Sequence, residues 1–143
     1  MTDGHARPPE SLQQDGPRLR RIAAEHDVMD ARVRDIEHRA QFVDWHALEE
    51  VWPKFSADLL EHLRFEEQDL FPWFLSEHPD AETYVGLLKD EHHVIRTELE
   101  TLGSEMQAHV LRGETIERFT RALCSHAARE RERFYPWLLE KAQ

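Results

Sequence analysis

Apolar residues recur at alternating steps of three and four positions in two segments of the chain. This spacing places them on one face of an α-helix and is typical of a helix that faces a core. The first face consists of Leu19, Ile22, His26, Met29, Val33, Ile36 and Ala40. The second face consists of Val85, Leu88, His92, Ile95, Leu99, Leu102 and Met106. Each pattern predicts a helix that buries one histidine in a position otherwise filled by apolar side chains.

Two further segments carry both a histidine and a glutamate on their apolar face. The earlier face consists of Phe55, Leu59, His62, Glu66, Leu70 and Trp73. The later face consists of Ile116, Phe119, Leu123, His126, Glu130 and Trp137. Residues four apart lie on the same side of a helix, so each segment points an imidazole and a carboxylate in one direction.

Prolines set the expected limits of these helices. Pro17 can open the first helix, which should end at about Gln41. Pro53 is expected to break or kink the chain before the main part of the second helix. Pro72 removes a backbone donor and is expected to bend that helix near its end. A turn at residues 78–80 then leads into the third helix.

The number of helices and their short links predict the fold. Four such helices favour an all-α, antiparallel, up-down-up-down four-helix bundle over residues 17–143. Residues 1–16 are polar, contain proline and glycine and lack periodicity, so they are expected to form a flexible N-terminal tail. A length of 143 residues fits one domain with a single core.

The two segments with His-x3-Glu are copies of a longer motif. The copies are His62-x3-Glu66 with Pro72-Trp73, and His126-x3-Glu130 with Pro136-Trp137. The helices that precede them also match, because Glu25-His26 in the first corresponds to Glu91-His92 in the third. Two related helical hairpins are therefore expected to build one site between them.

The predicted bundle would bury six residues that can bind a metal. An unpaired imidazole is costly to bury and an unpaired carboxylate more so, and a bound cation removes this cost. Six donors exceed a four-coordinate zinc site, whereas two carboxylates can bridge two ions and leave two histidines for each. Imidazole and carboxylate suit iron, manganese or zinc, and positions would stay open for water, dioxygen or peroxide. The expected ligands are His26, His62, Glu66, His92, His126 and Glu130.

Composition narrows the classes of partner. A net charge of −11 argues against binding nucleic acid or anionic lipid through a basic patch. The single Cys124 excludes an internal disulfide and a thiolate-rich metal site, and it should point away from His126. The first residues do not form a signal peptide, and no apolar run is long enough for a membrane span. We therefore expect a cytoplasmic protein.

Residues beside the expected ligands have lesser roles in this interpretation. His93 lies about 100° around the helix from His92 and could replace it as the ligand. Glu67 lies off the face of Glu66 and is expected to be solvated. Glu25 and Glu91 could accept the second imidazole proton of a neighbouring ligand, with solvent exposure as the alternative.

This set of motifs resembles the hemerythrin-like (HHE cation-binding) family. The resemblance rests on His26, His92 and the two His-x3-Glu motifs, together with Leu70-Phe71-Pro72 and Phe134-Tyr135-Pro136, and covers roughly residues 17–141. It implies a non-haem centre of two iron ions in a four-helix bundle, bridged by the two carboxylates and by an oxo, hydroxo or water bridge. Zinc or manganese is the alternative metal.

The chain differs from the invertebrate oxygen carriers of that family. Those proteins place two histidines one turn apart on the third helix, whereas the residues one turn from His92 are Leu88 and Arg96. Their last carboxylate is an aspartate, whereas this chain has Glu130. The resemblance therefore points to branches that sense oxygen or redox state, handle iron, break down peroxide, or handle nitric oxide and repair iron centres.

Three functions remain open at this point. The first is binding of dioxygen or a related small oxidant for sensing or storage, which would need a separate protein partner of unknown identity. The second is an enzyme that decomposes peroxide or handles nitric oxide, with Tyr135 as a candidate proton donor. The third is a bundle that holds metal for stability or buffering.

Overall fold

The structure is a computed structural model that describes residues 16–41 and 45–143, with their side chains except those of His26 and residues 37–41. Every regular element in these ranges is helical and none is a strand, so the all-α prediction is confirmed for the described residues. The long helices are α2 (Gly16–Gln41), α3 (Trp45–Phe65), α5 (Glu82–Gln107) and α6 (Gly113–Glu132). The shorter elements are the π-helical η1 (Glu66–Leu70), α4 (Phe71–Glu77), the 3-10 turn η2 (Pro79–Ala81) and α7 (Phe134–Lys141).

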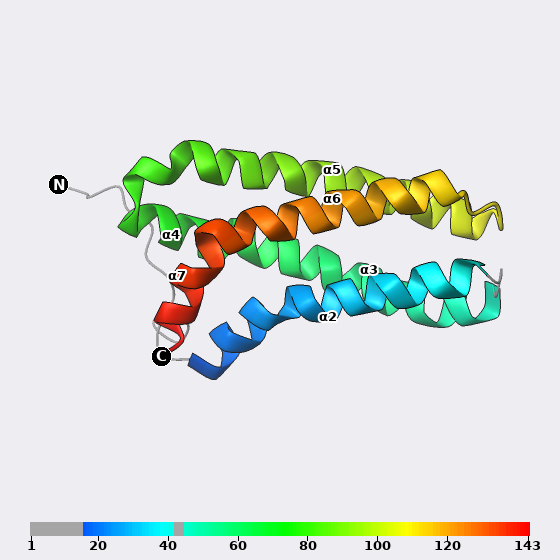
Figure 1. Ribbon diagram of the computed structural model, residues 1–143, viewed down its shortest axis with the longest axis horizontal. Coiled ribbons are helices and arrows are strands. Elements are labelled where there is room, and N and C mark those ends of the chain that lie inside the picture. Colours follow the sequence, from blue (N-terminus) through cyan, green and yellow to red (C-terminus); the bar gives the residue numbers. More distant parts are fainter. Residues whose placement is uncertain (1–15, 42–44) are drawn as a thin grey trace.

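The four long helices lie side by side along the long axis of the molecule (Figure 1). α2 and α5 lead away from the end that holds the C-terminus, and α3 and α6 lead back towards it. α4 extends the path of α3, whereas α7 turns across the end and packs against α2. There Arg20 Nη1 donates a hydrogen bond to the carbonyl of Ala142 at 2.6 Å.

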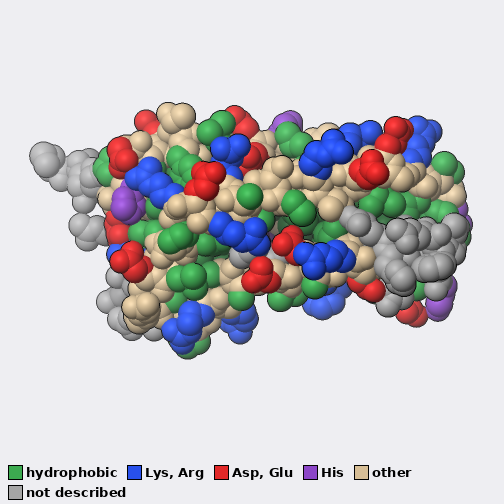
Figure 2. Space-filling model, in the orientation of Figure 1, with side chains coloured by type: hydrophobic (Ala, Val, Ile, Leu, Met, Phe, Trp, Pro, Cys, Tyr) green, Lys and Arg blue, Asp and Glu red, His purple; other side chains and the backbone are tan. Residues whose placement is uncertain are grey.

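The outer surface is mixed in charge. On the face shown in Figure 2, Lys and Arg side chains are interspersed with Asp and Glu side chains. No helix in the described part of the chain is both long enough and apolar enough to cross a membrane.

Two clusters of buried apolar side chains fill the interior, one towards each end of the long helices. On α5, Leu88 belongs to the cluster beside α4 and α7, and Ile95 belongs to the other cluster. His92 lies between them in sequence and is itself fully buried. The histidine and glutamate positions therefore lie at the junction of two apolar clusters, where water has little access.

The helix departs from regular α-geometry just before Pro72 and forms a π-turn; the bend expected there stays a prediction. Because proline has no backbone N–H, the helix cannot make the regular bond to the carbonyl of Gln68. The chain widens instead over Glu66–Leu70, and the Phe71 N–H donates to the carbonyl of Glu66. This single wide turn changes which side chains after Phe65 face the core.

The second copy of the motif meets its proline differently. α6 ends at Glu132, and Arg133, with φ −146° and ψ −43°, separates it from α7. The hydroxyl of Tyr84 donates to the carbonyl of Arg129 at 2.6 Å and accepts from the Phe134 N–H at 3.2 Å. This hydroxyl replaces backbone bonds that the break removes, so α7 can turn across the end of the molecule.

Of the two effects expected at Pro53, a break is wrong, and a kink stays a prediction. α3 runs without interruption from Trp45 to Phe65 with Pro53 inside it. A proline within a helix forfeits one backbone hydrogen bond, and tertiary packing can offset that loss. Leu48 and Phe55, on either side of Pro53, are both buried in the same apolar cluster, which holds the two parts of the helix together.

Candidate metal centre

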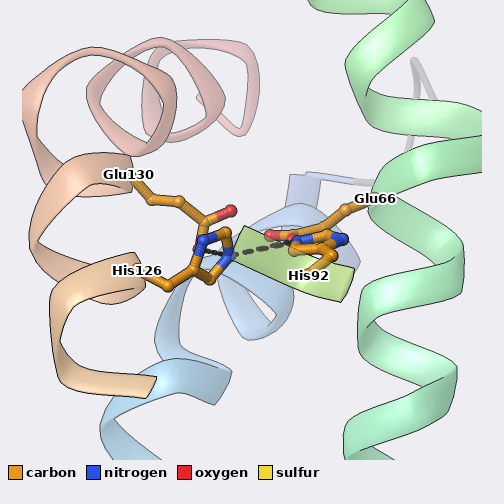
Figure 3. A group of neighbouring side chains, drawn as sticks. All are labelled: Glu66, His92, His126 and Glu130. Atoms are coloured by element: carbon orange, nitrogen blue, oxygen red, sulfur yellow. Dashed lines mark hydrogen bonds and ion pairs between the residues drawn. The ribbon is translucent and has the colours of Figure 1, made fainter. Parts of the chain in front are cut away.

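The long helices and η1 bring five of the six expected ligands to one buried region. His62 lies near the end of α3, Glu66 begins η1, His92 lies on α5, and His126 and Glu130 lie on α6. All five are buried, and Glu66 and His92 have no exposed surface. In Figure 3, Glu66 and His92 point towards His126 and Glu130 from the opposite side of the region.

The distances within this group are those of a compact cluster. His92 Nε2 lies 2.9 Å from Glu66 Oε1 and 3.0 Å from His126 Nε2. His126 Nε2 lies 3.3 Å from Glu130 Oε1, and His62 Nε2 lies 3.3 Å from Glu66 Oε2. One ligand atom each from Glu66, His92, His126 and Glu130 falls within 4.8 Å of the other three.

The donor set of the cluster fits a cation. Among the described residues, Glu66 Oε2 and Glu130 Oε2 are buried without a hydrogen-bond partner. His92 and His126 aim Nε2 at each other, and in neutral imidazoles a nitrogen without a proton offers only a lone pair. Carboxylate oxygens and imidazole nitrogens are ligands for iron, zinc and manganese, so one or more such ions would satisfy these atoms.

An outer carboxylate holds each of the three expected ligand histidines whose side chains the structure describes. His62 Nδ1 lies 2.5 Å from Glu25 Oε2, and His126 Nδ1 lies 3.0 Å from Glu91 Oε1. These two pairs agree with the first of the two alternatives for Glu25 and Glu91, contact with a ligand imidazole rather than solvent exposure. A carboxylate on Nδ1 selects the tautomer that leaves Nε2 free to bind a metal, and it fixes the orientation of the ring.

The third pair was missed by sequence reasoning, which placed Glu67 in solvent. Glu67 Oε2 lies 2.6 Å from His92 Nδ1 and accepts a hydrogen bond from Arg96 at 2.8 Å. The wide turn of η1 changes the direction of side chains after Phe65, so Glu66 and Glu67 both reach His92. Arg96 follows His92 by four residues, and this spacing is the one signal in the sequence that could have indicated the contact.

Arg129 is hydrogen-bonded to Glu91 as Arg96 is to Glu67. Its Nε donates to Glu91 Oε2 at 2.6 Å, while the other oxygen of Glu91 faces His126. Arg96 and Arg129 therefore keep two of the outer carboxylates ionised and oriented. Sequence reasoning did not identify Arg129, because no motif marked it among the many arginines of α6.

His26 is the sixth expected ligand. His26 lies on α2, but its side chain is outside the described part of the structure, so its role stays a prediction. His93 is exposed, whereas His92 belongs to the cluster. Cys124 is exposed, in agreement with the predicted direction of its side chain.

Substituting Glu67 tests how much an outer carboxylate contributes to metal affinity. The change Glu67→Gln should lower the affinity for Fe2+ or Zn2+ by roughly 10–100-fold, because the His92 ring loses its anionic partner. Titration with a competing chelator measures the affinity. The matched control is Glu100→Gln, an exposed position on α5. Equal affinities in the two variants would show that Glu67 does not support metal binding.

The buried carboxylates control the protonation of the metal-free cluster. Burial disfavours a charged His62, but the charge of Glu66 and the hydrogen bond with Glu25 raise its pKa to about 10. Burial likewise opposes charge on His126, whose carboxylate partners raise its pKa to about 11. Burial and the charge of Glu66 raise the pKa of Glu130 to about 8. Despite its burial, the neighbouring imidazoles hold the pKa of Glu66 well below its usual value.

These shifts predict opposite effects of pH on the metal-free and the metal-bound protein. Because the folded pKa values of His62 and His126 exceed 6.5, their charged forms stabilise the metal-free fold fully below pH 6.5. This stabilisation is lost as the pH rises towards 10. A cation displaces the same protons, so metal binding strengthens with pH. The difference in melting temperature between zinc-loaded and chelator-treated protein should widen between about pH 6 and 9. A constant or shrinking difference would contradict these assignments.

A small, mostly apolar cavity lies against the cluster. Its volume is about 20 Å³, and its walls include Met29, His62, His126, Glu130 and Tyr135. This volume exceeds the space that one water molecule needs, roughly 10–15 Å³. We name this space the inner cavity. It can hold a molecule of two or three atoms beside the imidazoles and Glu130.

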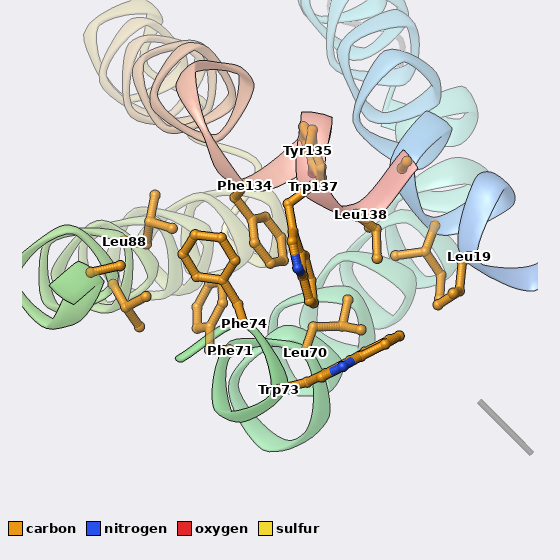
Figure 4. Packing of buried hydrophobic residues seen from close by; sticks show 14 of the residues in the cluster. Leu19, Leu70, Phe71, Trp73, Phe74, Leu88, Phe134, Tyr135, Trp137 and Leu138 are labelled. Atoms are coloured by element: carbon orange, nitrogen blue, oxygen red, sulfur yellow. The ribbon is translucent and has the colours of Figure 1, made fainter. Parts of the chain in front are cut away.

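An aromatic cluster closes the end of the site beside α4 and α7. Trp73 and Trp137 meet edge to face with ring centroids 5.0 Å apart, and Phe71 and Phe134 pack beside them (Figure 4). The two indole N–H groups donate to the two oxygens of Glu77, at 3.1 and 3.0 Å. The repeated tryptophans of the two motifs are thus joined through one carboxylate.

Removing that carboxylate should destabilise the fold. The change Glu77→Ala leaves two largely buried indole donors without their acceptor and should lower the free energy of unfolding by about 1–3 kcal/mol. Urea denaturation monitored by tryptophan fluorescence measures this loss. The exposed Glu140→Ala on α7 serves as the control. A loss no greater than that of the control would show that Glu77 does not join the two tryptophans in solution.

Comparison with known proteins agrees with the donor set. The family model described as Hemerythrin HHE cation binding domain matches residues 17–138. A search of curated proteins and a search of solved structures found no match. The matched range contains every residue of the cluster and of the inner cavity.

Proposed function

Because the chain belongs to the hemerythrin HHE cation-binding domain family, we propose that it is a non-haem di-iron protein that binds dioxygen or a related small oxidant. Its role would be oxygen or redox sensing, or storage of the ligand. The observation that carries this proposal is the inner cavity, whose walls include His62, His126 and Glu130. A cation held by this cluster would face a space that accepts a small molecule and little else.

The proposal includes the fold that holds the centre. Residues 17–143 would form an antiparallel up-down-up-down four-helix bundle, and residues 1–16 a separate tail. The side-by-side arrangement of α2, α3, α5 and α6 in Figure 1 supports the bundle. Such bundles commonly build metal centres from side chains on facing helices.

Two ions fit the proposed ligands better than one. Glu66 would bridge, because it lies near His62 of α3 and His92 of α5. Glu130, which lies 3.3 Å from His126 of its own helix, would be the second bridging carboxylate. Two histidines would remain for each ion, from the set His26, His62, His92 and His126. This set leaves coordination positions open beside the inner cavity. Bound iron would supply a redox-active centre for a small oxidant, whereas zinc would not.

The residues around the centre would orient the metal-binding imidazoles and shield a bound small molecule from water. Glu25, Glu67 and Glu91 hold the imidazoles in fixed orientations. Apolar side chains, among them Met29, line the inner cavity and would limit the access of bulk water. Exclusion of water strengthens electrostatic interactions inside the cavity and limits proton leakage to a bound oxidant.

A second candidate function is an enzyme that decomposes peroxide or handles nitric oxide, and Tyr135 favours it. Tyr135 is 3% exposed and lines the inner cavity. Burial and the charges of Glu66 and Glu130 raise its pKa well above the usual value of 10. The phenol therefore keeps its proton at neutral pH and can donate it to a molecule in the cavity.

One experiment separates these functions. Anaerobic, reduced, iron-loaded protein is mixed first with dioxygen and then, in a separate sample, with hydrogen peroxide, and the absorption spectrum is followed. A reversible oxygen-dependent band supports the binding function. Rapid loss of peroxide that slows in Tyr135→Phe supports the enzyme. Iron-loaded protein that responds to neither reagent would overturn both and leave a metal-storing or structural role.

A further inference from the structure

The inner cavity does not lie alone, because a larger pocket adjoins it on the outside. This outer pocket lies between α2 and α3 and has a volume of about 460 Å³. Its walls include Glu25, Val28 and Phe65, and Val28 is 53% exposed at its side. A volume of this size admits small molecules from solvent without any movement of the helices.

Two residues line both spaces. Met29 on α2 and His62 on α3 form part of the wall of the outer pocket and part of the wall of the inner cavity. Met29 is 5% exposed and His62 is 8% exposed. They therefore form a wall that the two spaces share.

These two residues differ in the contacts that hold their side chains. His62 is held on both ring nitrogens, by Glu25 at 2.5 Å and by Glu66 at 3.3 Å. Met29 has an unbranched, apolar side chain with three rotatable bonds, which can change rotamer without breaking a hydrogen bond. Rotation of Met29 would join the inner cavity to the outer pocket, and its return would close the connection.

We propose that small ligands reach the metal centre through the outer pocket and past Met29, whose side chain sets the size of the molecules that pass. This inference rests on the proposed function, because it concerns the ligand of that centre. The molecules admitted are uncharged and of two or three heavy atoms, such as dioxygen, nitric oxide or hydrogen peroxide. Bulky organic peroxides are excluded.

The competing path is less suitable. A second outside pocket, of about 330 Å³ between α2 and the α6–α7 region, shares only Tyr135 with the inner cavity. Tyr135 belongs to the packed aromatic cluster, with its ring centroid 5.6 Å from that of Phe134. Moving this ring would disturb the packing of α7. Met29 also belongs to a buried apolar cluster, but its unbranched side chain can change rotamer without a shift of its helix.

Two surface variants test the path without touching the core. Val28→Trp fills the outer pocket, and Leu139→Trp fills the competing pocket; the two original side chains are 53% and 47% exposed. The readout is the stopped-flow rate of nitric oxide binding to reduced, iron-loaded protein. Val28→Trp should slow binding by about tenfold, which corresponds to a barrier higher by about 1.4 kcal/mol, and Leu139→Trp should leave it unchanged. Slower binding in Leu139→Trp alone would assign the path to Tyr135 and overturn the proposal.

Variants of Met29 test the residue itself. Met29→Ala should speed nitric oxide binding and allow the iron-loaded protein to react with cumene hydroperoxide, which the unaltered chain excludes. Met29→Leu, which nearly conserves volume, serves as the control for folding and should give a rate between those of Met29→Ala and Val28→Trp. Equal rates in Met29→Ala and the unaltered chain, at equal iron content, would contradict a size-setting role.

A readout that does not depend on iron separates this inference from the proposed function. In zinc-loaded protein labelled with 13C at methionine methyl groups, dissolved dioxygen enhances the relaxation of methyls that it approaches. Met29 and Met106 are 5% and 6% exposed, and both line an outside pocket. Stronger enhancement at Met29 than at Met106 supports the path even if iron binds no oxygen. Equal enhancement overturns the path and leaves the proposed function intact.

Discussion

Replacing Glu66 by glutamine is expected to remove most of the bound metal and to lower the free energy of unfolding of the metal-free protein by about 3–5 kcal/mol at pH 7. Glu66 has no exposed surface and lies within 3.3 Å of both His62 and His92. Its charge is a principal reason that the pKa of His62 rises to about 10. Without that charge, the His62 imidazolium either loses its proton or stays buried as a cation without its anionic partner Glu66.

The same substitution also removes a bridging ligand. A glutamine oxygen carries no charge and binds cations more weakly than a carboxylate does, so neither ion would be held as before. Metal analysis after gel filtration gives the content, and urea denaturation in the presence of a chelator gives the stability. Glu61→Gln, on the exposed side of α3 where Glu61 pairs with Arg64, should change neither by much. Similar metal content in both variants would show that Glu66 is not a ligand.

Replacing His62 by alanine is expected to have the second largest effect. The change removes a nitrogen that faces Glu66 and leaves Glu25 without its 2.5 Å partner. Metal content should fall, and with it the stabilisation that a ligand gives by mass action, about 2.7 kcal/mol at a metal concentration of 100 times Kd. For a chain of this size that loss lowers the melting temperature by roughly 10 °C.

His46 provides the matched histidine. Its side chain is 86% exposed, and its one described ion pair is with its helical neighbour Glu50, which is 67% exposed. His46→Ala should therefore change neither the metal content nor the melting temperature beyond experimental error. If both variants keep full metal content, the proposed ligand set is wrong; if both lose it, the effect is not specific to the cluster.

Periodicity alone predicted most of the interior. On α5 every expected core position, from Val85 to Met106, is buried, because a fixed step of three or four residues suffices to define one face of a regular helix. The same reasoning predicted that each His-x3-Glu pair shares one face of its helix, because residues i and i+4 lie on the same side. The structure places both pairs and His92 in one buried region. Ile116 is the exception among the described positions, being only partly buried near the start of α6.

Departures from a regular helix could not be predicted in the same way. Pro72 and Pro136 stand at equal offsets in the two motifs, yet one copy forms a π-turn and the other a break at Arg133. The difference depends on Tyr84, which is remote in sequence and supplies a hydroxyl to the break. Glu67 illustrates the consequence, because only the wide turn directs it towards His92 rather than into solvent.

The charged partners of the outer carboxylates also depend on tertiary contacts. Glu91 and Arg129 come from α5 and α6, and no spacing rule within one helix relates them. Sequence reasoning identified Glu91 because it precedes His92 as Glu25 precedes His26, but it gave no reason to single out Arg129. Contacts of this kind become visible only when the helices have been placed side by side.

The central claim is that two ions occupy the space between Glu66 and Glu130 and compensate the burial of the surrounding imidazoles. Diffraction from crystals of the iron-loaded protein, measured on both sides of the iron absorption edge, tests it most directly. The account predicts two anomalous peaks between these carboxylates, each beside two histidine nitrogens, with His26 among the ligands. A single surface peak, or no peak within the cluster of Glu66, His92, His126 and Glu130, would contradict it.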